Sequence, residues 1–120
     1  MLHHLKINNY TTYSGVTQNI SLSYQVFGQP LRTAPIVLVN HALTGNSDVA
    51  GEHGWWSTLI GDDKCIDTKK YTVLAFNIPG NGFDGFVIEN YKDFVARDMA
   101  RIFLQGLDLL VIKKLYAIIG

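Results

Sequence analysis

The spacing of apolar residues changes several times along this chain, and each spacing predicts a different element. Between residues 20 and 27 apolar and polar side chains alternate, which predicts a strand with one buried and one solvated face. The face expected to meet solvent holds Ser21, Ser23 and Gln25. Residues 5 to 14 are polar and aromatic, and we expect them to form a first strand at the edge of a sheet.

Three later segments are largely apolar and contain β-branched residues, which is typical of strands buried on both faces of a parallel sheet. These segments are residues 36–40, 71–76 and 115–119. Between the second and third of these segments, apolar residues recur at helical spacing. They predict a helix that begins at Asn90 as N-cap, has Asp93 in its first turn and ends near Leu110. A strand, a helix and a parallel strand in succession indicate α/β architecture.

The connection between the first two buried strands is long and contains several glycines. We expect a loop over residues 44–54, a short helical segment over 55–60 and a solvated connection over 61–70. Trp55 and Trp56 are adjacent, and adjacent residues do not share a face of a helix or a strand. At least one of them is therefore expected to line a site or anchor a loop.

Composition indicates one small globular domain. Of 120 residues, 48% are apolar and 17% charged, and ten basic residues balance ten acidic ones. Zero net charge argues against nucleic acid and membrane surfaces as partners. No apolar run approaches the roughly 18 residues of a membrane helix and no signal sequence is evident, so we expect a cytoplasmic protein. The single cysteine, Cys65, is interpreted as a small buried hydrophobic residue.

Residues 80–85 match the dinucleotide-binding pattern G-x-G-x-x-G. That pattern requires a glycine turn that opens directly into a helix. Pro79 precedes the match, and four residues separate it from the next expected helix, so no helix N-terminus lies beside the glycines to bind phosphate. We interpret the segment as a glycine-rich loop.

Candidate chemistry lies directly after the first buried strand, where the sequence is His-Ala-Leu-Thr-Gly-Asn over residues 41–46. In open α/β sheets ligands bind at the carboxyl ends of the strands. In α/β-hydrolases the loop after the third strand donates one backbone N–H to the oxyanion hole. An ordinary strand-to-helix connection is the alternative that the local pattern leaves open.

A more specific resemblance is spread over residues 36–120. The segments that carry it are His41-Ala42-Leu43-Thr44-Gly45-Asn46, Gly54-Trp55-Trp56, Leu59-Ile60-Gly61, Ile66-Asp67-Thr68, Tyr71, Asn77, Arg97-Asp98-Met99, Leu115 and Ile118-Ile119-Gly120. In this order and spacing they resemble the homoserine O-acetyltransferase family of α/β-hydrolase-fold acyltransferases. The resemblance implies a partial α/β-hydrolase fold, with a mostly parallel sheet preceded by antiparallel strands, and residues 1–120 as the N-terminal part of a single domain.

The activity implied by this resemblance is transfer of an acetyl group from acetyl-CoA to the hydroxyl of homoserine, a step of methionine biosynthesis. The implied oxyanion-hole donor is the backbone N–H of Leu43, and the implied substrate-binding residues are Ala42, Thr44 and Asn46. Asn46 has an equally plausible role in bonding its own turn. No metal and no bound cofactor are expected, acetyl-CoA being a substrate, and the complete protein is expected to be a homodimer.

The resemblance also implies that Gly120 begins the sharp turn that presents the nucleophile. A Ser-Asp-His triad, in that chain order, is then expected after residue 120. Residues 1–120 alone are accordingly expected to be inactive and to self-associate through an unpaired last strand. After Asn77 the sequence departs from the family, since residues 78–85 replace a loop that borders the acceptor pocket; the acceptor alcohol is therefore open.

Two other functions share these features. A serine esterase or thioesterase would use the same loop and triad but admit water to the acyl-enzyme, and a non-catalytic α/β module would lack the nucleophile. The resemblance makes His41 a histidine that shapes the loop rather than a catalytic base. For Arg97 and Asp98 we favour a surface pair or a bond to a neighbouring loop over recognition of a charged ligand.

Overall fold

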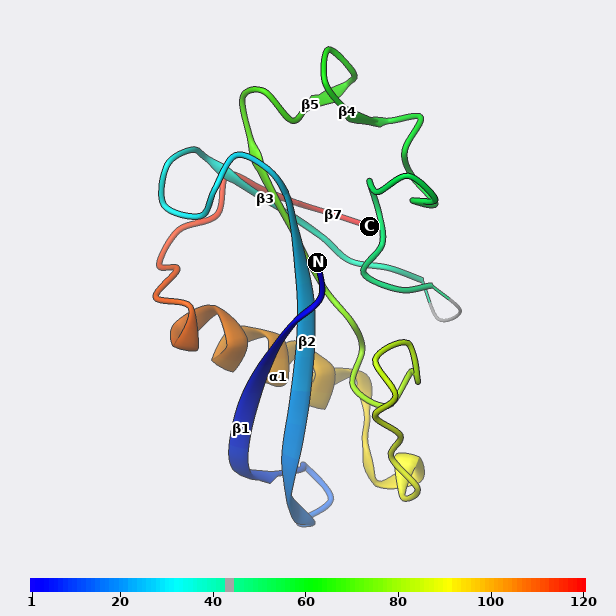
Figure 1. The fold of residues 1–120 in the computed structure, drawn as a ribbon. Helices are drawn as coiled ribbons and strands as arrows, with labels where there is room; N and C mark the ends of the chain where they lie inside the picture. The colour runs from blue at the N-terminus through cyan, green and yellow to red at the C-terminus, as the bar shows by residue number, and fades with distance from the viewer. Residues whose placement is uncertain (43–44) are drawn as a thin grey trace.

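In the part of the chain that the structure describes, a five-stranded sheet is crossed by one α-helix (Figure 1). The structure, a computed structural model, describes residues 1–42 and 45–120. Its elements are β1 (His3–Thr11), β2 (Thr17–Gly28), β3 (Ile36–Val39), β4 (Ile60–Gly61), β5 (Ile66–Asp67), β6 (Thr72–Phe76), the 3-10 turn η1 (Tyr91–Asp93), α1 (Ala96–Leu109) and β7 (Ala117–Ile119).

The order of the main sheet is β1-β2-β6-β3-β7. β1 pairs with β2, and β2 with β6, in antiparallel fashion, whereas β3 is parallel to both β6 and β7. Val37 of β3 stands opposite Val73 on one side and Ala117 on the other. The predicted combination of antiparallel N-terminal strands with a parallel remainder is confirmed. β4 and β5 form a separate two-stranded parallel sheet.

β3 and β6 are buried on both faces, as their continuous apolar runs predict. Side chains on one face pack with α1, and the core there consists of Ile7, Tyr10, Ile20, Leu22, Ile36, Leu38, Leu74, Phe76, Ile88, Ile102, Leu107, Leu110 and Ile112. Alternate residues fill a second core on the other face, made of Val37, Val39, Val49, Ile60, Val73 and Ala75. The pleat of the sheet thus divides each run between two cores.

Helix α1 lies close against the sheet at Gly106. A Cβ atom at that position would lie 2.6 Å from Cδ2 of Leu22 and 3.0 Å from Cε1 of Phe76. The sequence marks this glycine as a weak point of the helix, and the structure gives the reason for it. Absence of a side chain is what lets the helix rest on the β2 and β6 side chains.

The predicted start of the helix at Asn90 is wrong. Residues 91–93 form only a 3-10 turn, Phe94 is extended, and α1 begins at Ala96. Asn90 does not cap the turn, because its amide donates to the side chains of Gln18 and Asp93. The N-terminus of α1 is instead satisfied by Asp98, whose Oδ2 accepts the N–H of Val95 at 2.8 Å.

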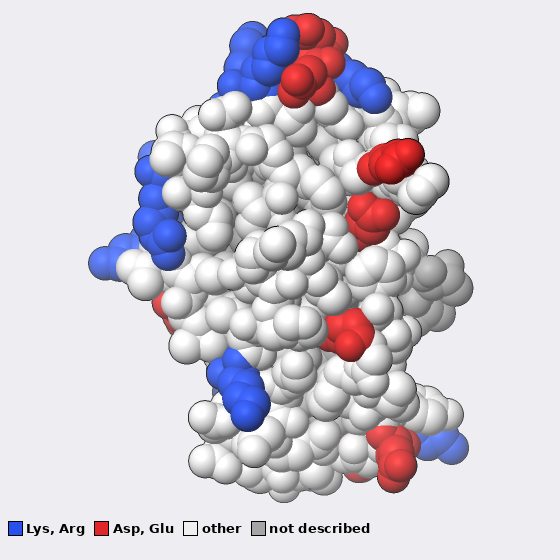
Figure 2. All heavy atoms as spheres, viewed as in Figure 1, with Lys and Arg blue, Asp and Glu red and all other residues white. Residues whose placement is uncertain are grey.

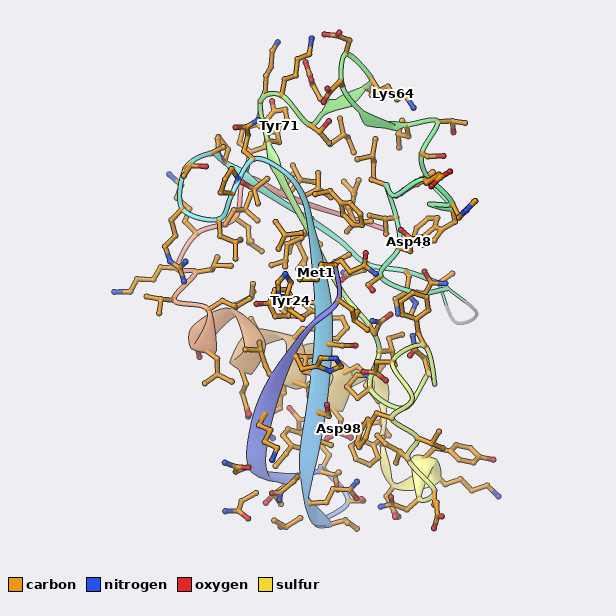
Figure 3. All side chains as sticks on the ribbon, in the orientation of Figure 1. Met1, Tyr24, Asp48, Lys64, Tyr71 and Asp98 are labelled. Carbon is orange, nitrogen blue, oxygen red and sulfur yellow. The ribbon has the colours of Figure 1, made fainter. Side chains whose placement is uncertain are left out.

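Asp98 is fully buried and joins α1 to the β1–β2 hairpin (Figure 3). Its Oδ1 accepts the hydroxyl of Tyr10 at 2.6 Å and the N–H of Tyr13 at 3.1 Å. Burial opposes ionisation, but the bonds from Tyr10, Val95 and Tyr13 outweigh it and hold the pKa of the Asp98 carboxyl below its ordinary value. Asp98 therefore bonds a neighbouring segment, as favoured from the sequence, and burial and this bond raise the pKa of Tyr10.

The expectation that residues 115–119 form a buried strand is wrong. β7 covers only Ala117–Ile119, the side chain of Ile118 is 61% exposed, and the other two residues are half-buried. β7 pairs with β3 alone among the strands of the described residues, so it lies at the edge of the sheet. An edge strand shares the composition of an interior strand but not its burial.

Candidate active site

The carboxyl ends of β3 and β6 meet at one edge of the sheet because the two strands are parallel neighbours. Two loops leave from that edge: the β3 loop, residues 40–47, and the β6 loop, residues 77–85. Leu43 and Thr44, the predicted oxyanion donor and one of the predicted substrate contacts, lie outside the described residues. Their roles stay predictions, and the structure defines the segments on either side of them.

The first of these segments is held by the imidazole of His41, which is 8% exposed. Its Nε2 accepts the backbone N–H of Ile78 at 2.9 Å, and its Nδ1 lies 2.6 Å from the carbonyl oxygen of Ala42. Because Nε2 is an acceptor here, the ring is neutral and Nδ1 carries the proton that it donates to Ala42. Both nitrogens are thus engaged in shaping the β3 loop, which matches the role expected of His41.

Ser47 holds the segment on the other side. Its backbone N–H donates to Oδ1 of Asn77 at 2.7 Å, and its hydroxyl oxygen accepts Nδ2 of the same residue at 2.8 Å. Nδ2 of Asn77 also donates to the hydroxyl of Ser23, and Nε2 of Gln25 donates to that of Ser47 at 3.2 Å. These four side chains, which we call the polar network, are all buried.

The polar network corrects the prediction that Ser23 and Gln25 face solvent. They are 1% and 8% exposed, because Ser47 and Asn77 lie over that face of β2 and bond to them. A polar side chain on an alternating strand indicates solvent only where nothing covers it, and here hydrogen bonds to Ser47 and Asn77 replace water.

Two further predicted site residues belong to the β3 loop. Ala42 is exposed, and its carbonyl accepts the N–H of Gly45 at 2.9 Å as well as the His41 ring. Oδ1 of Asn46 accepts the N–H of Asp48 at 2.9 Å, which is the turn-forming role left open for it. Nε1 of Trp55 donates to the carbonyl of Asn46 at 2.9 Å, so Trp55 anchors the loop as expected.

Trp56 stacks on Trp55, with ring centroids 5.0 Å apart, and packs on the second core. The adjacent tryptophans thus join the β3 loop to the interior. The expected short helical segment amounts to a single turn, closed by the bond from Ile60 N–H to the Trp56 carbonyl at 3.0 Å.

The β6 loop contains the glycine pattern, and no helix opens from it. Gly80, Gly82 and Gly85 have φ values of +88°, +81° and +85°, a backbone region that favours glycine. The loop interpretation of this segment is confirmed. Asn81 links the two loops, since its Nδ2 lies 3.3 Å from Oδ1 of Asn77 and 3.5 Å from the carbonyl of Gly45.

The end of β7 lies beside the start of the β3 loop. Asn40 donates its N–H to the carbonyl of Ile119 at 2.8 Å, and a Cβ atom on Gly120 would lie 3.3 Å from the Asn40 carbonyl oxygen. Among the described residues, Oδ1 of Asn40 is a buried atom without a hydrogen-bond partner. The carboxyl ends of three parallel strands therefore converge on the same site.

We also searched the described residues for metal ligands, a reactive cysteine, charged patches and membrane-spanning helices. No cluster of three His, Cys, Asp or Glu residues suited to a metal occurs in residues 1–42 and 45–120. Cys65 is exposed, contrary to the expectation of a buried residue. Figure 2 shows both signs of charge together over the β4–β5 region and scattered elsewhere on that face. None of the described helices has the length and apolar character needed to cross a bilayer.

Comparison with known proteins agrees with this geometry. Residues 35–120 match the model of the alpha/beta hydrolase fold family. The chain belongs to that family. It is also 35% identical, over 94% of its length, to the homoserine O-acetyltransferase of Methanococcus vannielii, and 34% identical, over 99%, to that of Corynebacterium diphtheriae. The predicted resemblance is thus confirmed, although the chain spans only 27% and 35% of these two relatives.

Solved structures give the same fold. Homoserine O-acetyltransferase from Staphylococcus aureus superposes with a TM-score of 0.80 at 27% identity, over 100% of this chain and 38% of that one. Esterase E22 superposes with a TM-score of 0.81 at 26% identity, over 100% of this chain and 40% of that one. A transferase and an esterase therefore fit equally well, and the fold alone does not separate the two activities.

Proposed function

We propose that the protein to which this chain belongs is an acyl-CoA-dependent O-acyltransferase that moves an acetyl group from acetyl-CoA to the hydroxyl of homoserine. The observation that carries the proposal is the 34–35% identity to named homoserine O-acetyltransferases over nearly the whole chain. It is supported by the hydrogen bonds of His41 and Ser47 at the strand ends where an α/β-hydrolase places its oxyanion hole. A cytoplasmic homodimer acting in methionine biosynthesis is part of the proposal.

The reaction proceeds in two half-reactions. A serine hydroxyl attacks the thioester carbonyl, its proton passes to a histidine, and CoA leaves as the thiol after taking up that proton. The homoserine hydroxyl then attacks the acyl-serine ester, loses its proton to the same histidine, and the serine regains one as it departs. We expect the serine, the histidine and the aspartate that orients it to lie outside residues 1–120.

Residues 42–46 are proposed to serve both half-reactions. Each passes through a tetrahedral oxyanion, which the Leu43 N–H is proposed to stabilise, with Ala42, Thr44 and Asn46 lining the substrate site. One such donor is worth about 3–4 kcal/mol of transition-state stabilisation. The His41 ring and the polar network bond the residues on either side of 43–44 to β2 and to the chain that follows β6.

An esterase is the second candidate, and the equal fit of esterase E22 is the observation that favours it. The two differ in whether water or an alcohol accepts the acyl group. The test measures release of free CoA by the intact protein from acetyl-CoA, with and without homoserine, and identifies the acyl product. Homoserine-dependent CoA release that yields O-acetylhomoserine supports the transferase; acetate release indifferent to any alcohol refutes it.

A further inference from the structure

Two consecutive residues at the end of β6 hold both sides of the β3 loop. The backbone N–H of Ile78 donates to Nε2 of His41 at 2.9 Å, ahead of residues 43–44. The side chain of Asn77 accepts the N–H of Ser47 at 2.7 Å, behind them. The described residues on both sides of 43–44, His41 and Ser47, are therefore bonded to the chain that follows β6 as well as being connected to β3.

The orientation of the Asn77 side chain has no alternative. The Ser47 N–H requires an acceptor, so Oδ1 must face it, and Nδ2 then faces the hydroxyls of Ser23 and Ser47, each at 2.8 Å. Rotation of the amide by 180° would set two donors against each other. With the side chain 1% exposed, water cannot replace any of these bonds.

We propose that Asn77 is a positioning residue for acyl transfer: it fixes the position of Ser47, and with it the described end of the β3 loop, relative to the carboxyl end of β6. The proposal rests on the proposed function. Its physical basis is that a misplacement of about 1 Å at a reacting centre can cost on the order of 100-fold in rate. The buried Asn77 side chain uses its acceptor and both of its amide donors in hydrogen bonds. A loop residue bonded to such a side chain is positioned more precisely than one bonded only to water.

The Asn77 side chain contributes little to the hydrophobic core, which separates positioning from folding. The neighbouring β6 residues Val73 to Phe76 supply the buried apolar surface, whereas Asn77 bonds to Ser23 on β2 and to Ser47. Replacement by leucine, which has the same number and branching of side-chain heavy atoms, keeps the site filled and removes every bond. A destabilised protein with a displaced loop is therefore expected rather than an unfolded one.

Amide hydrogen exchange tests the positioning without any assay of activity. In the wild-type protein the Ser47 N–H should exchange slowly although it lies in a loop, and Asn77→Leu should accelerate it by at least roughly tenfold, the factor for one ordinary hydrogen bond. Tyr10→Phe is the matched control: it removes a buried bond to Asp98, far from the β3 loop (Figure 3), and should leave the Ser47 rate relative to β6 amides unchanged.

Steady-state kinetics of the intact protein supply the second readout. Asn77→Leu should lower kcat by roughly 100-fold with the KM for acetyl-CoA changed by less than about twofold, and Tyr10→Phe should leave both unchanged. An unchanged kcat in Asn77→Leu, or an equal loss in Tyr10→Phe, overturns the proposal. If the leucine variant does not fold, a wild-type Ser47 amide that exchanges as fast as a solvated loop also overturns it.

Failure of the proposed function is a different result. If the wild-type protein transfers no acetyl group to homoserine but hydrolyses acetyl esters, kcat is measured on that reaction, and the same ratio between the two variants is expected. The exchange experiment is unaffected by which acceptor the protein uses.

Discussion

The buried bond between Tyr10 and Asp98 makes a quantitative prediction about stability. Tyr10→Phe removes a hydroxyl that donates to the Asp98 carboxylate at 2.6 Å, leaves no cavity, and leaves Asp98 with the two backbone donors at Val95 and Tyr13. A hydrogen bond to a charged group contributes about 1.5–3 kcal/mol. We expect that much loss in the free energy of unfolding at neutral pH, measured by urea denaturation with the slope unchanged.

The companion variant Asp98→Asn should cost more. Its oxygen still accepts from Tyr10 and Tyr13, but its NH2 group faces the N–H of Val95, so a buried donor is left without an acceptor at the start of α1. The loss of one charge-assisted bond together with that unsatisfied donor amounts to about 3–5 kcal/mol.

The contribution of Asp98 to the free energy of unfolding should decrease at low pH. The folded pKa of Asp98 lies below its ordinary value, so its contribution is complete above the ordinary aspartate pKa of about 3.9 and is lost as pH falls towards the folded value. The difference in stability between wild type and Asp98→Asn should shrink below about pH 4. A Tyr10→Phe loss under about 0.5 kcal/mol, or a difference between wild type and Asp98→Asn that is constant with pH, would refute this reasoning.

Four further predictions follow from other contacts. His41→Leu, which removes the acceptor for the Ile78 N–H, should lower kcat, whereas His41→Gln, whose Oε1 can reach the same N–H, should restore part of it. Leu43→Pro should lower kcat by about 100-fold or more through loss of a backbone donor, and Leu43→Ala far less; equal losses would remove the backbone role. Gly106→Ala should destabilise by about 1–3 kcal/mol in thermal melts, because its Cβ would lie 2.6 Å from Leu22; a gain would show that helix propensity dominates. Residues 1–120 alone should self-associate through the β7 edge and show no acetyl transfer, and a monodisperse monomer in light scattering at high concentration would contradict the first part.

The sequence predicts where the strands lie along the chain better than it predicts their place in the sheet or the start of the helix. The apolar runs at 36–40 and 71–76 locate β3 and β6 closely, because burial on both faces demands such runs. The run at 115–119 predicts a strand but not its place at an edge, since pairing partners are not encoded in the run itself. The helix start is misplaced because Asn90 has the residue type of an N-cap, whereas its amide bonds the distant Gln18 and α1 begins at Ala96.

The location of the site could be predicted from the sequence, but the contacts that hold it could not. Its location after β3 follows from the abrupt change from apolar to polar residues at Asn40 and His41. The polar network could not be predicted, because Ser23 and Gln25 lie on a strand in which polar and apolar residues alternate. Such alternation indicates that the polar face meets solvent. Nothing in a local pattern shows that residues more than twenty positions later cover them. The burial of Ser23 and Gln25 is recognised only once their partners, Asn77 and Ser47, are in place.

The division of the loop's anchorage between two strands bears on how such a site can be transplanted. If residues 41–47 alone were moved into another hydrolase scaffold, they would lack Asn77 and Ile78, to which His41 and Ser47 bond. Neither residue would then be held as it is here. Ser23, Gln25, Asn77 and Ile78 would have to travel with them as one cassette drawn from three separate stretches of chain. The unit of exchange in this region is thus a cross-strand patch rather than a contiguous motif.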